Sequence, residues 1–200
     1  MMWTGGELTK VTSPDPYGRI GNQAGSEASS VVLGDYKSDP DAELERPTRV
    51  SLTDTATGGL RLVDLPASYS FRSLGRGDAG EALVLGTDGA LHVIDPSTGE
   101  LTRSVPVVAA WEEPEEWQQP RPTLFVHDGT AYVSEPATDQ LHAVDVETGE
   151  VFASADLGVT PNEVSGASGD VEAGSEELSE GEEGHDHEDH DHVEPSTDDA

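Results

Sequence analysis

A short apolar strand that stops at an aspartate occurs three times in the sequence. The copies are Leu60–Asp64, Leu91–Asp95 and Leu141–Asp145. An aspartate in this place can close a turn with its own side chain. The second and third copies continue alike, as Pro96–Leu101 and Val146–Val151, in which a Thr-Gly pair supplies the positive φ angle of a hairpin. The repeat therefore predicts an antiparallel meander of strands joined by tight turns.

Other short apolar segments precede these copies. Ala82–Leu85 leads into the turn Asp88-Gly89, and the turn Asp128-Gly129 joins Thr123–Val126 to Thr130–Val133. The segments are four to six residues long, and none has a convincing helical period. These patterns predict an all-β fold.

The spacing of the repeats favours one all-β architecture. Leu60 and Leu91 are 31 residues apart, and Leu91 and Leu141 are 50 apart, whereas a four-stranded propeller blade repeats about every 40–50 residues. We therefore expect a partial β-propeller of about three blades, of the YVTN/WD40-like kind, over residues 1–163. A proline-rich insertion at 111–122 accounts for the longer interval, and we expect it on one face, with its two tryptophans over the propeller mouth.

The start of the chain resembles the middle of a blade. Thr4–Val11 matches the turn and outer strand Thr98–Val105, and closed propellers typically have four to eight blades. We therefore expect an N-terminally truncated chain, with earlier blades and an export signal upstream. The first residues contain neither a basic n-region nor an apolar h-region, so we expect no signal peptide in the chain as written. It also has no cysteine, which excludes disulfides, Cys-ligated zinc and thiol catalysis.

Charge separates the C-terminal segment from the rest. Residues 164–200 contain fourteen Asp or Glu, no Lys or Arg and no aromatic residue. Because so few apolar side chains cannot offset the entropy of ordering, we expect this tail to be disordered. The whole chain has a net charge of −31, which argues against nucleic-acid and anionic-membrane partners. No apolar run reaches transmembrane length, so we expect no membrane insertion.

The tail contains a His-rich tract with the composition of a divalent-metal site. Its candidate ligands are His185, Asp186, His187, Glu188, Asp189, His190, Asp191 and His192. Neutral imidazole binds zinc, copper and nickel, and an ordinary histidine pKa of about 6.5 leaves most of these rings neutral at pH 7. We expect metal binding here and release in acid, although a merely solvated acidic tail is the alternative.

The remaining histidines and the acidic insertion have simpler interpretations. His92 and His142 occupy the same place in the repeat, and we interpret both as structural, facing solvent or a neighbouring blade. His127 flanks a turn, where we expect a surface role rather than coordination. The insertion carries a charge run that we expect to be solvated, made of Glu112, Glu113, Glu115 and Glu116.

Two longer stretches resemble known families. Ala131–Asp145 is similar to the repeat unit of YVTN-type propellers, which share a fold and differ in function. The run from Leu91 to Gly169, including Trp111–Pro114, Gln118–Pro122 and Thr160–Val164, looks like the C-terminal blades of the AztD-type zinc metallochaperones. Tyr17–Asp64 resembles them more weakly.

This resemblance implies a function and a compartment. AztD-type proteins are exported bacterial β-propellers that bind zinc and deliver it to the solute-binding protein of a zinc ABC transporter. The resemblance implies that the metal is zinc, although the residues alone do not exclude copper or nickel. It also implies an extracellular or periplasmic location. The family's zinc ligands in the folded domain do not map onto particular positions of this chain, so the tail is the one metal site that we predict.

Two other functions remain open at this point. The chain could be a non-catalytic acidic propeller that binds other proteins and is kept soluble by its tail, or a fragment of a propeller enzyme. It has no nucleophile elbow, phosphate loop, His-Glu-x-x-His helix or dinucleotide fingerprint. We therefore expect neither catalysis nor a small organic substrate.

Overall fold

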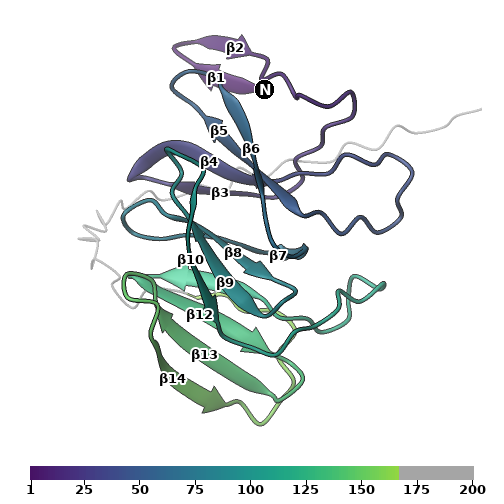
Figure 1. The fold of residues 1–200 in the computed structure, drawn as a ribbon, viewed down its shortest axis with the longest axis vertical. Coiled ribbons are helices and arrows are strands. Elements are labelled where there is room, and N and C mark those ends of the chain that lie inside the picture. Colours follow the sequence, from purple (N-terminus) through teal and green to yellow (C-terminus); the bar gives the residue numbers. More distant parts are fainter. Residues whose placement is uncertain (167–200) are drawn as a thin grey trace, which may run out of the picture. The chain divides into compact units, whose positions relative to one another are not determined.

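The computed structural model describes residues 1–166, which form antiparallel β-sheets joined by turns and loops (Figure 1). The strands are β1 (Met2–Thr4), β2 (Glu7–Thr9), β3 (Gln23–Ser26), β4 (Ser29–Asp35), β5 (Arg49–Asp54), β6 (Leu60–Asp64), β7 (Tyr69–Arg76), β8 (Ala82–Gly86), β9 (Ala90–Ile94), β10 (Leu101–Pro106), β11 (Leu124–His127), β12 (Thr130–Glu135), β13 (Gln140–Asp145) and β14 (Val151–Asp156).

Three of the four sheets are four-stranded meanders. β3–β6, β7–β10 and β11–β14 each pair in chain order, while β1 and β2 form a separate hairpin. The first strands of neighbouring sheets lie side by side, because β7 contacts both β3 and β11. Successive blades of a propeller are related in this way, so the predicted all-β fold with about three blades is confirmed. The predicted domain limit at residue 163 stays a prediction, and the predicted disorder concerns residues that lie almost entirely outside the described part.

The core lies between consecutive sheets. Leu33 of β4 and Leu52 of β5 pack with Val84 of β8. The neighbouring residues of β8, Leu83 and Leu85, pack instead with the sheet formed by β11–β14. Side chains alternate between the two faces of a strand, and both faces of β8 are covered, so all five of its residues are buried. This explains why Ala82–Gly86 is almost entirely apolar.

The structure corrects the alignment of the repeats. Leu91–Asp95 and Leu141–Asp145 belong to third strands, β9 and β13, but Leu60–Asp64 is the fourth strand of its sheet. The third strand there is β5, which ends at Asp54 and is followed by Thr57-Gly58. The equivalent aspartates are therefore 41 and 50 residues apart. The prediction that Leu60–Asp64 is equivalent to the other two copies is therefore wrong. This fourth strand has one buried face and so shows the same apolar pattern as the third strands.

The predicted turn chemistry is confirmed. Asp95 Oδ1 accepts hydrogen bonds from the Ser97 hydroxyl at 2.6 Å and from the Ser97 backbone N–H at 2.7 Å. Asp145 Oδ1 accepts the Thr148 N–H at 2.7 Å. These bonds stabilise the carboxylates and lower the pKa of Asp95 and Asp145. Gly99 and Gly149, which follow in the turns, have φ angles of 77° and 78°.

An arginine on each of two outer strands bonds to the next sheet. Arg61 Nη1 donates to the Ser97 carbonyl at 3.0 Å, and Arg103 Nη1 donates to the Val146 carbonyl, also at 3.0 Å. Each arginine also lies against the glycine of the turn that it reaches. A Cβ placed on Gly149 would lie 2.9 Å from the Arg103 Cδ and 2.9 Å from Val105. The glycine is therefore required both by its φ angle and by the contact between sheets.

The variant Gly149→Ala tests this contact. Gly158 has a similar φ of 65°, but nothing lies within 4 Å of its Cβ position, so Gly158→Ala is a matched control for backbone strain alone. We expect Gly149→Ala to lower the free energy of unfolding by about 1–3 kcal/mol more than Gly158→Ala, because overpacking adds to the strain. Urea unfolding measures both variants, and equal losses would contradict the proposed contact.

Candidate functional site

The predicted metal ligands lie outside the described residues. This holds for His185, Asp186, His187, Glu188, Asp189, His190, Asp191 and His192. Within residues 1–166, no three His, Cys, Asp or Glu side chains are grouped so as to hold a metal ion. The metal site in the tail therefore stays a prediction.

The two equivalent histidines have structural partners. His92 Nδ1 is 2.8 Å from Ser104 Oγ, and its Nε2 is 3.2 Å from Asp88 Oδ1. His142 is held in the same way, with Nδ1 2.8 Å from Ser154 Oγ and Nε2 3.3 Å from Glu135 Oε2. Both rings are buried, and each serine lies directly opposite its histidine on the next strand. The structural interpretation is confirmed, although neither ring faces solvent.

His127 lies at the end of β11 and is exposed. Its ring stacks on Phe125, with 6.3 Å between the ring centroids, and Phe125 in turn contacts Tyr132 at 6.0 Å. This position agrees with the predicted surface role beside the Asp128-Gly129 turn.

The insertion between β10 and β11 contains a buried ion pair. Glu112, Glu115 and Glu116 are exposed as expected, but the prediction was wrong for Glu113, which is 5% exposed. Glu113 Oε1 accepts a hydrogen bond from Arg121 Nη1 at 2.9 Å. The sequence shows four similar glutamates, and the fold of the insertion decides which one turns inward.

Arg121 is 1% exposed and organises the insertion. Its Nη2 donates to the Glu116 carbonyl at 2.9 Å, and its guanidinium lies 5.1 Å from the centre of the Phe71 ring. The tryptophans differ: Trp111 Nε1 donates to the Gly86 carbonyl at 3.0 Å, whereas Trp117 is 66% exposed. Of the two tryptophans of the insertion, Trp117 is therefore the more exposed.

Burial has a larger effect than ion pairing on the pKa values of Glu113 and Arg121. Desolvation raises the pKa of Glu113, although the Arg121 charge acts in the opposite direction. Desolvation likewise lowers the pKa of Arg121. The pKa of Glu113 is therefore higher in the folded state than in the unfolded state. As a result, this residue destabilises the fold as the pH rises and its carboxyl group loses its proton, whereas at low pH the neutral form carries no such cost.

A cavity of about 180 Å³ adjoins this ion pair. Its walls come from the end of β4, the β4–β5 loop, the start of β7 and the insertion, and they include Asp35, Lys37, Tyr69, Glu113 and Trp117. Asp35 is 1% exposed. Its Oδ1 accepts the backbone N–H groups of Gly21 and Asn22 at 2.6 and 3.1 Å, whereas its buried Oδ2 has no hydrogen-bond partner. Sequence reasoning missed Asp35, because an aspartate at the end of a strand is also an ordinary turn residue.

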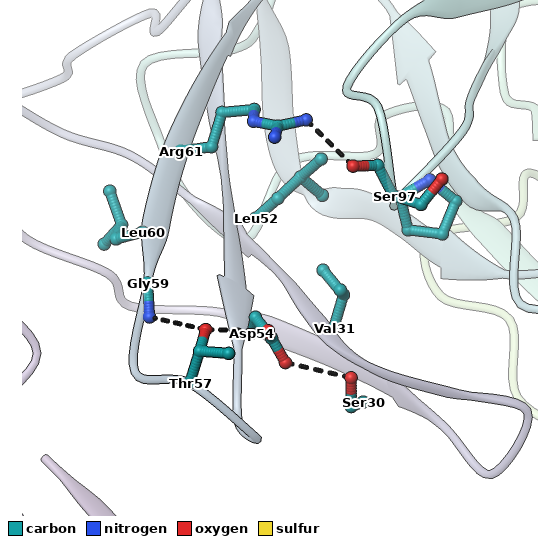
Figure 2. A pocket seen from close by; sticks show the side chains of 10 residues that line it. Ser30, Val31, Leu52, Asp54, Thr57, Gly59, Leu60, Arg61 and Ser97 are labelled. Atoms are coloured by element: carbon teal, nitrogen blue, oxygen red, sulfur yellow. Dashed lines mark hydrogen bonds between the residues drawn. The ribbon is translucent and has the colours of Figure 1, made fainter.

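A larger pocket of about 430 Å³ lies where the β5–β6 turn approaches the sheet formed by β7–β10. Figure 2 shows that its polar side chains are engaged with their neighbours. Asp54 accepts hydrogen bonds from Ser30 at 2.9 Å and from Thr57 at 2.7 Å, and Arg61 bonds to the Ser97 carbonyl. These groups hold turns together, so we assign the pocket a structural role.

Comparison with known proteins agrees with the fold and with the resemblance seen in the sequence. The chain is similar to the zinc chaperone AztD of Citrobacter koseri, with 28% identity over 131 residues, or 65% of this chain and 29% of that protein. The structure of apo AztD from the same organism matches with a TM-score of 0.66 and 24% identity, covering 78% of this chain and 41% of that one. The computationally designed Ika4 protein matches with a TM-score of 0.52 and 16% identity, over 75% of this chain and 81% of that one.

The predicted resemblance to AztD is therefore confirmed. The chain spans less than half the length of the AztD proteins that it matches. No protein-family profile matches it. Among residues 1–166, no helix has the length and apolar character needed to cross a membrane.

The buried ion pair gives a prediction that depends on pH. Arg121→Met leaves Glu113 buried without its partner, which costs about 3 kcal/mol of unfolding free energy at pH 7. The loss should be smaller at pH 5, because desolvation raises the pKa of Glu113 and a larger fraction of the side chain is then neutral and needs no countercharge. Urea unfolding at both pH values measures this difference.

Arg19→Met is the control, since Arg19 is exposed and removing it changes the net charge by the same amount. We expect a loss below about 0.5 kcal/mol for this surface substitution. Equal losses for Arg121→Met at the two pH values would contradict the proposed role of Glu113.

Proposed function

We propose that the protein is a zinc metallochaperone that captures zinc with its C-terminal tract and delivers it to the solute-binding protein of a zinc ABC transporter. The observation that carries the proposal is the sequence similarity to a protein named zinc chaperone, which extends over 65% of this chain. We further propose that it acts in zinc transport outside the cytoplasm, in the periplasm or the extracellular space.

The chemistry of the tract supports zinc capture. Four imidazoles and four carboxylates occupy eight consecutive residues, His185 to His192. Both groups are ordinary zinc ligands, and imidazole needs no deprotonation at neutral pH. Copper and nickel accept the same ligands, so the choice of zinc rests on the similarity to AztD.

Charge and ligand type also suit delivery. A net charge of −31 attracts divalent cations and the basic surfaces of other proteins. Imidazole and carboxylate ligands on one segment can be replaced one at a time by ligands of a partner, so the ion can be handed over without unfolding the blades. In this proposal the blades provide a non-catalytic scaffold that the partner recognises.

Zinc titration calorimetry tests the capture step. The test variant replaces His185, His187, His190 and His192 with alanine, and we expect zinc affinity at pH 7 to fall at least tenfold. A matched control keeps the histidines and removes four carboxylates upstream, with glutamine at Glu172, Glu176, Glu177 and Glu180. We expect this control to bind zinc nearly as well as the native chain.

Acid gives an independent check of the same ligands. At pH 5, only about 3% of each ordinary imidazole is neutral, so binding by the native chain should be largely lost. Zinc binding that survives the histidine substitutions would contradict the tail site. If neither the native chain nor the variants bind zinc, an acidic interaction protein becomes the better explanation.

Delivery needs its own measurement. The zinc-loaded chain is mixed with the zinc-free solute-binding protein of a zinc ABC transporter, and the metal content of each protein is measured after separation. Faster loading than from free zinc at the same total concentration, in the presence of a competing chelator, would support delivery. Equal loading from the chain and from free zinc would contradict it.

A further inference from the structure

The outer strand of the β11–β14 sheet has an edge that pairs with no strand of residues 1–166. β14 comes last in the strand order of this sheet, so a row of its backbone N–H and C=O groups faces away from β13 (Figure 1). All six residues of β14 are exposed, and Phe152 is 55% exposed. An exposed edge of this kind is a template for pairing with another chain.

β14 lacks a basic residue that the other two outer strands carry. The equivalent position is Arg61 in β6, Arg103 in β10 and Ala153 in β14, each paired with the third strand of its sheet. Both arginines bond to the next sheet, whereas alanine has no side-chain donor. Charged residues and prolines commonly protect sheet edges, and β10 also ends at Pro106. The edge of β14 is therefore the least protected of the three.

The β11–β14 sheet is acidic. Residues 122–166 contain eight Asp or Glu and no Lys or Arg. Two of these carboxylates stand at opposite ends of β14, since Glu150 precedes the strand and Asp156 is its last residue. Both are exposed, and neither forms an ion pair within residues 1–166. The edge therefore combines an uncharged centre with acidic ends.

Charge decides which kind of strand fits this edge. An antiparallel pair of two β14 strands would bring Glu150 of each copy near Asp156 of the other, and like charges opposite each other destabilise strand pairs. Each copy also has a net charge of −31, which opposes self-association. A strand with Lys or Arg at both ends would meet opposite charges at the same two places. The edge therefore fits a basic segment better than a second copy of this chain.

We propose that the outer edge of β14 binds an extended segment of another protein, which adds to the sheet as a fifth strand. The segment has uncharged residues at its centre and Lys or Arg on both sides. Backbone hydrogen bonds give the affinity in this mode of recognition, and side chains give the selectivity. Here the selectivity comes from Phe152, Glu150 and Asp156. The proposal does not depend on zinc binding by the tail.

The test follows the backbone amide signals of the full zinc-free chain by NMR. The probe is a blocked peptide, Lys-Val-Thr-Val-Thr-Val-Lys. One control peptide has glutamate in place of both lysines, and the other has proline in place of the central valine, which keeps the charge but removes a backbone donor. We expect shifts along β14 with the probe and at least tenfold weaker binding of both controls. Equal shifts along β14 with the proline peptide would overturn the proposal.

The variant Ala153→Arg places at the edge the residue that the other two outer strands have. We expect the fold to be kept and the probe to bind at least tenfold more weakly, because a positive charge at the edge repels a basic strand. Ala28→Arg is the control, since it changes the net charge equally at an exposed position between β3 and β4. Equal affinity of the two variants for the probe would overturn the assignment of β14 as the binding edge.

A second pair of variants tests the acidic ends and leaves the centre of the strand unchanged. Glu150→Gln combined with Asp156→Asn removes both end charges, and asparagine keeps an oxygen for the Gly158 N–H that Asp156 accepts. We expect about threefold weaker and less salt-dependent binding of the probe. Glu112→Gln combined with Glu115→Gln removes two exposed carboxylates of the insertion and should leave binding unchanged. Equal affinities of the two double variants would contradict the role of the end charges.

Sedimentation of the native chain without peptide tests the alternative occupant. We expect a monomer at both low and high salt. A dimer that Ala153→Arg abolishes would show that a second copy occupies the edge and would overturn the assignment to a basic segment.

Discussion

The structure depends on the packing of each four-stranded sheet against the next. No single meander has a core of its own, because its apolar side chains point to both faces. The middle sheet shows this most clearly, since β8 directs Val84 to one neighbour and Leu83 and Leu85 to the other. Arg61 and Arg103 add a hydrogen bond at the outer edge of each junction. The apolar core therefore forms where consecutive sheets meet.

This packing leaves polar chemistry to the connections. The insertion before β11 closes over Arg121, which satisfies backbone carbonyls of the loop as well as Glu113. Burial of that pair costs free energy that a surface loop would not incur, but the pair holds one wall of the cavity near Asp35. Trp117 stays exposed at the same place.

The proposed zinc ligands and the cavity belong to different parts of the chain. The proposed zinc ligands follow one another in the sequence, so their proximity needs no fold. The cavity is the opposite case, because Asp35, Tyr69 and Glu113 are far apart in the sequence and meet only when the first two sheets and the insertion come together.

The sequence by itself determined most strands after residue 80, their hairpin turns and the composition of the tail, whereas β3, β4, β5 and β7 were not predicted. Alternation of apolar residues and the Asp-x-x-Thr-Gly turn are local signals, and they place β9, β13 and their hairpins without any knowledge of distant residues. Only the tertiary structure decided that β6 is a fourth strand, that Glu113 alone among its neighbours is buried, and that Asp35 lies in a cavity. Burial and strand order depend on contacts between residues far apart in the chain, which no local pattern encodes.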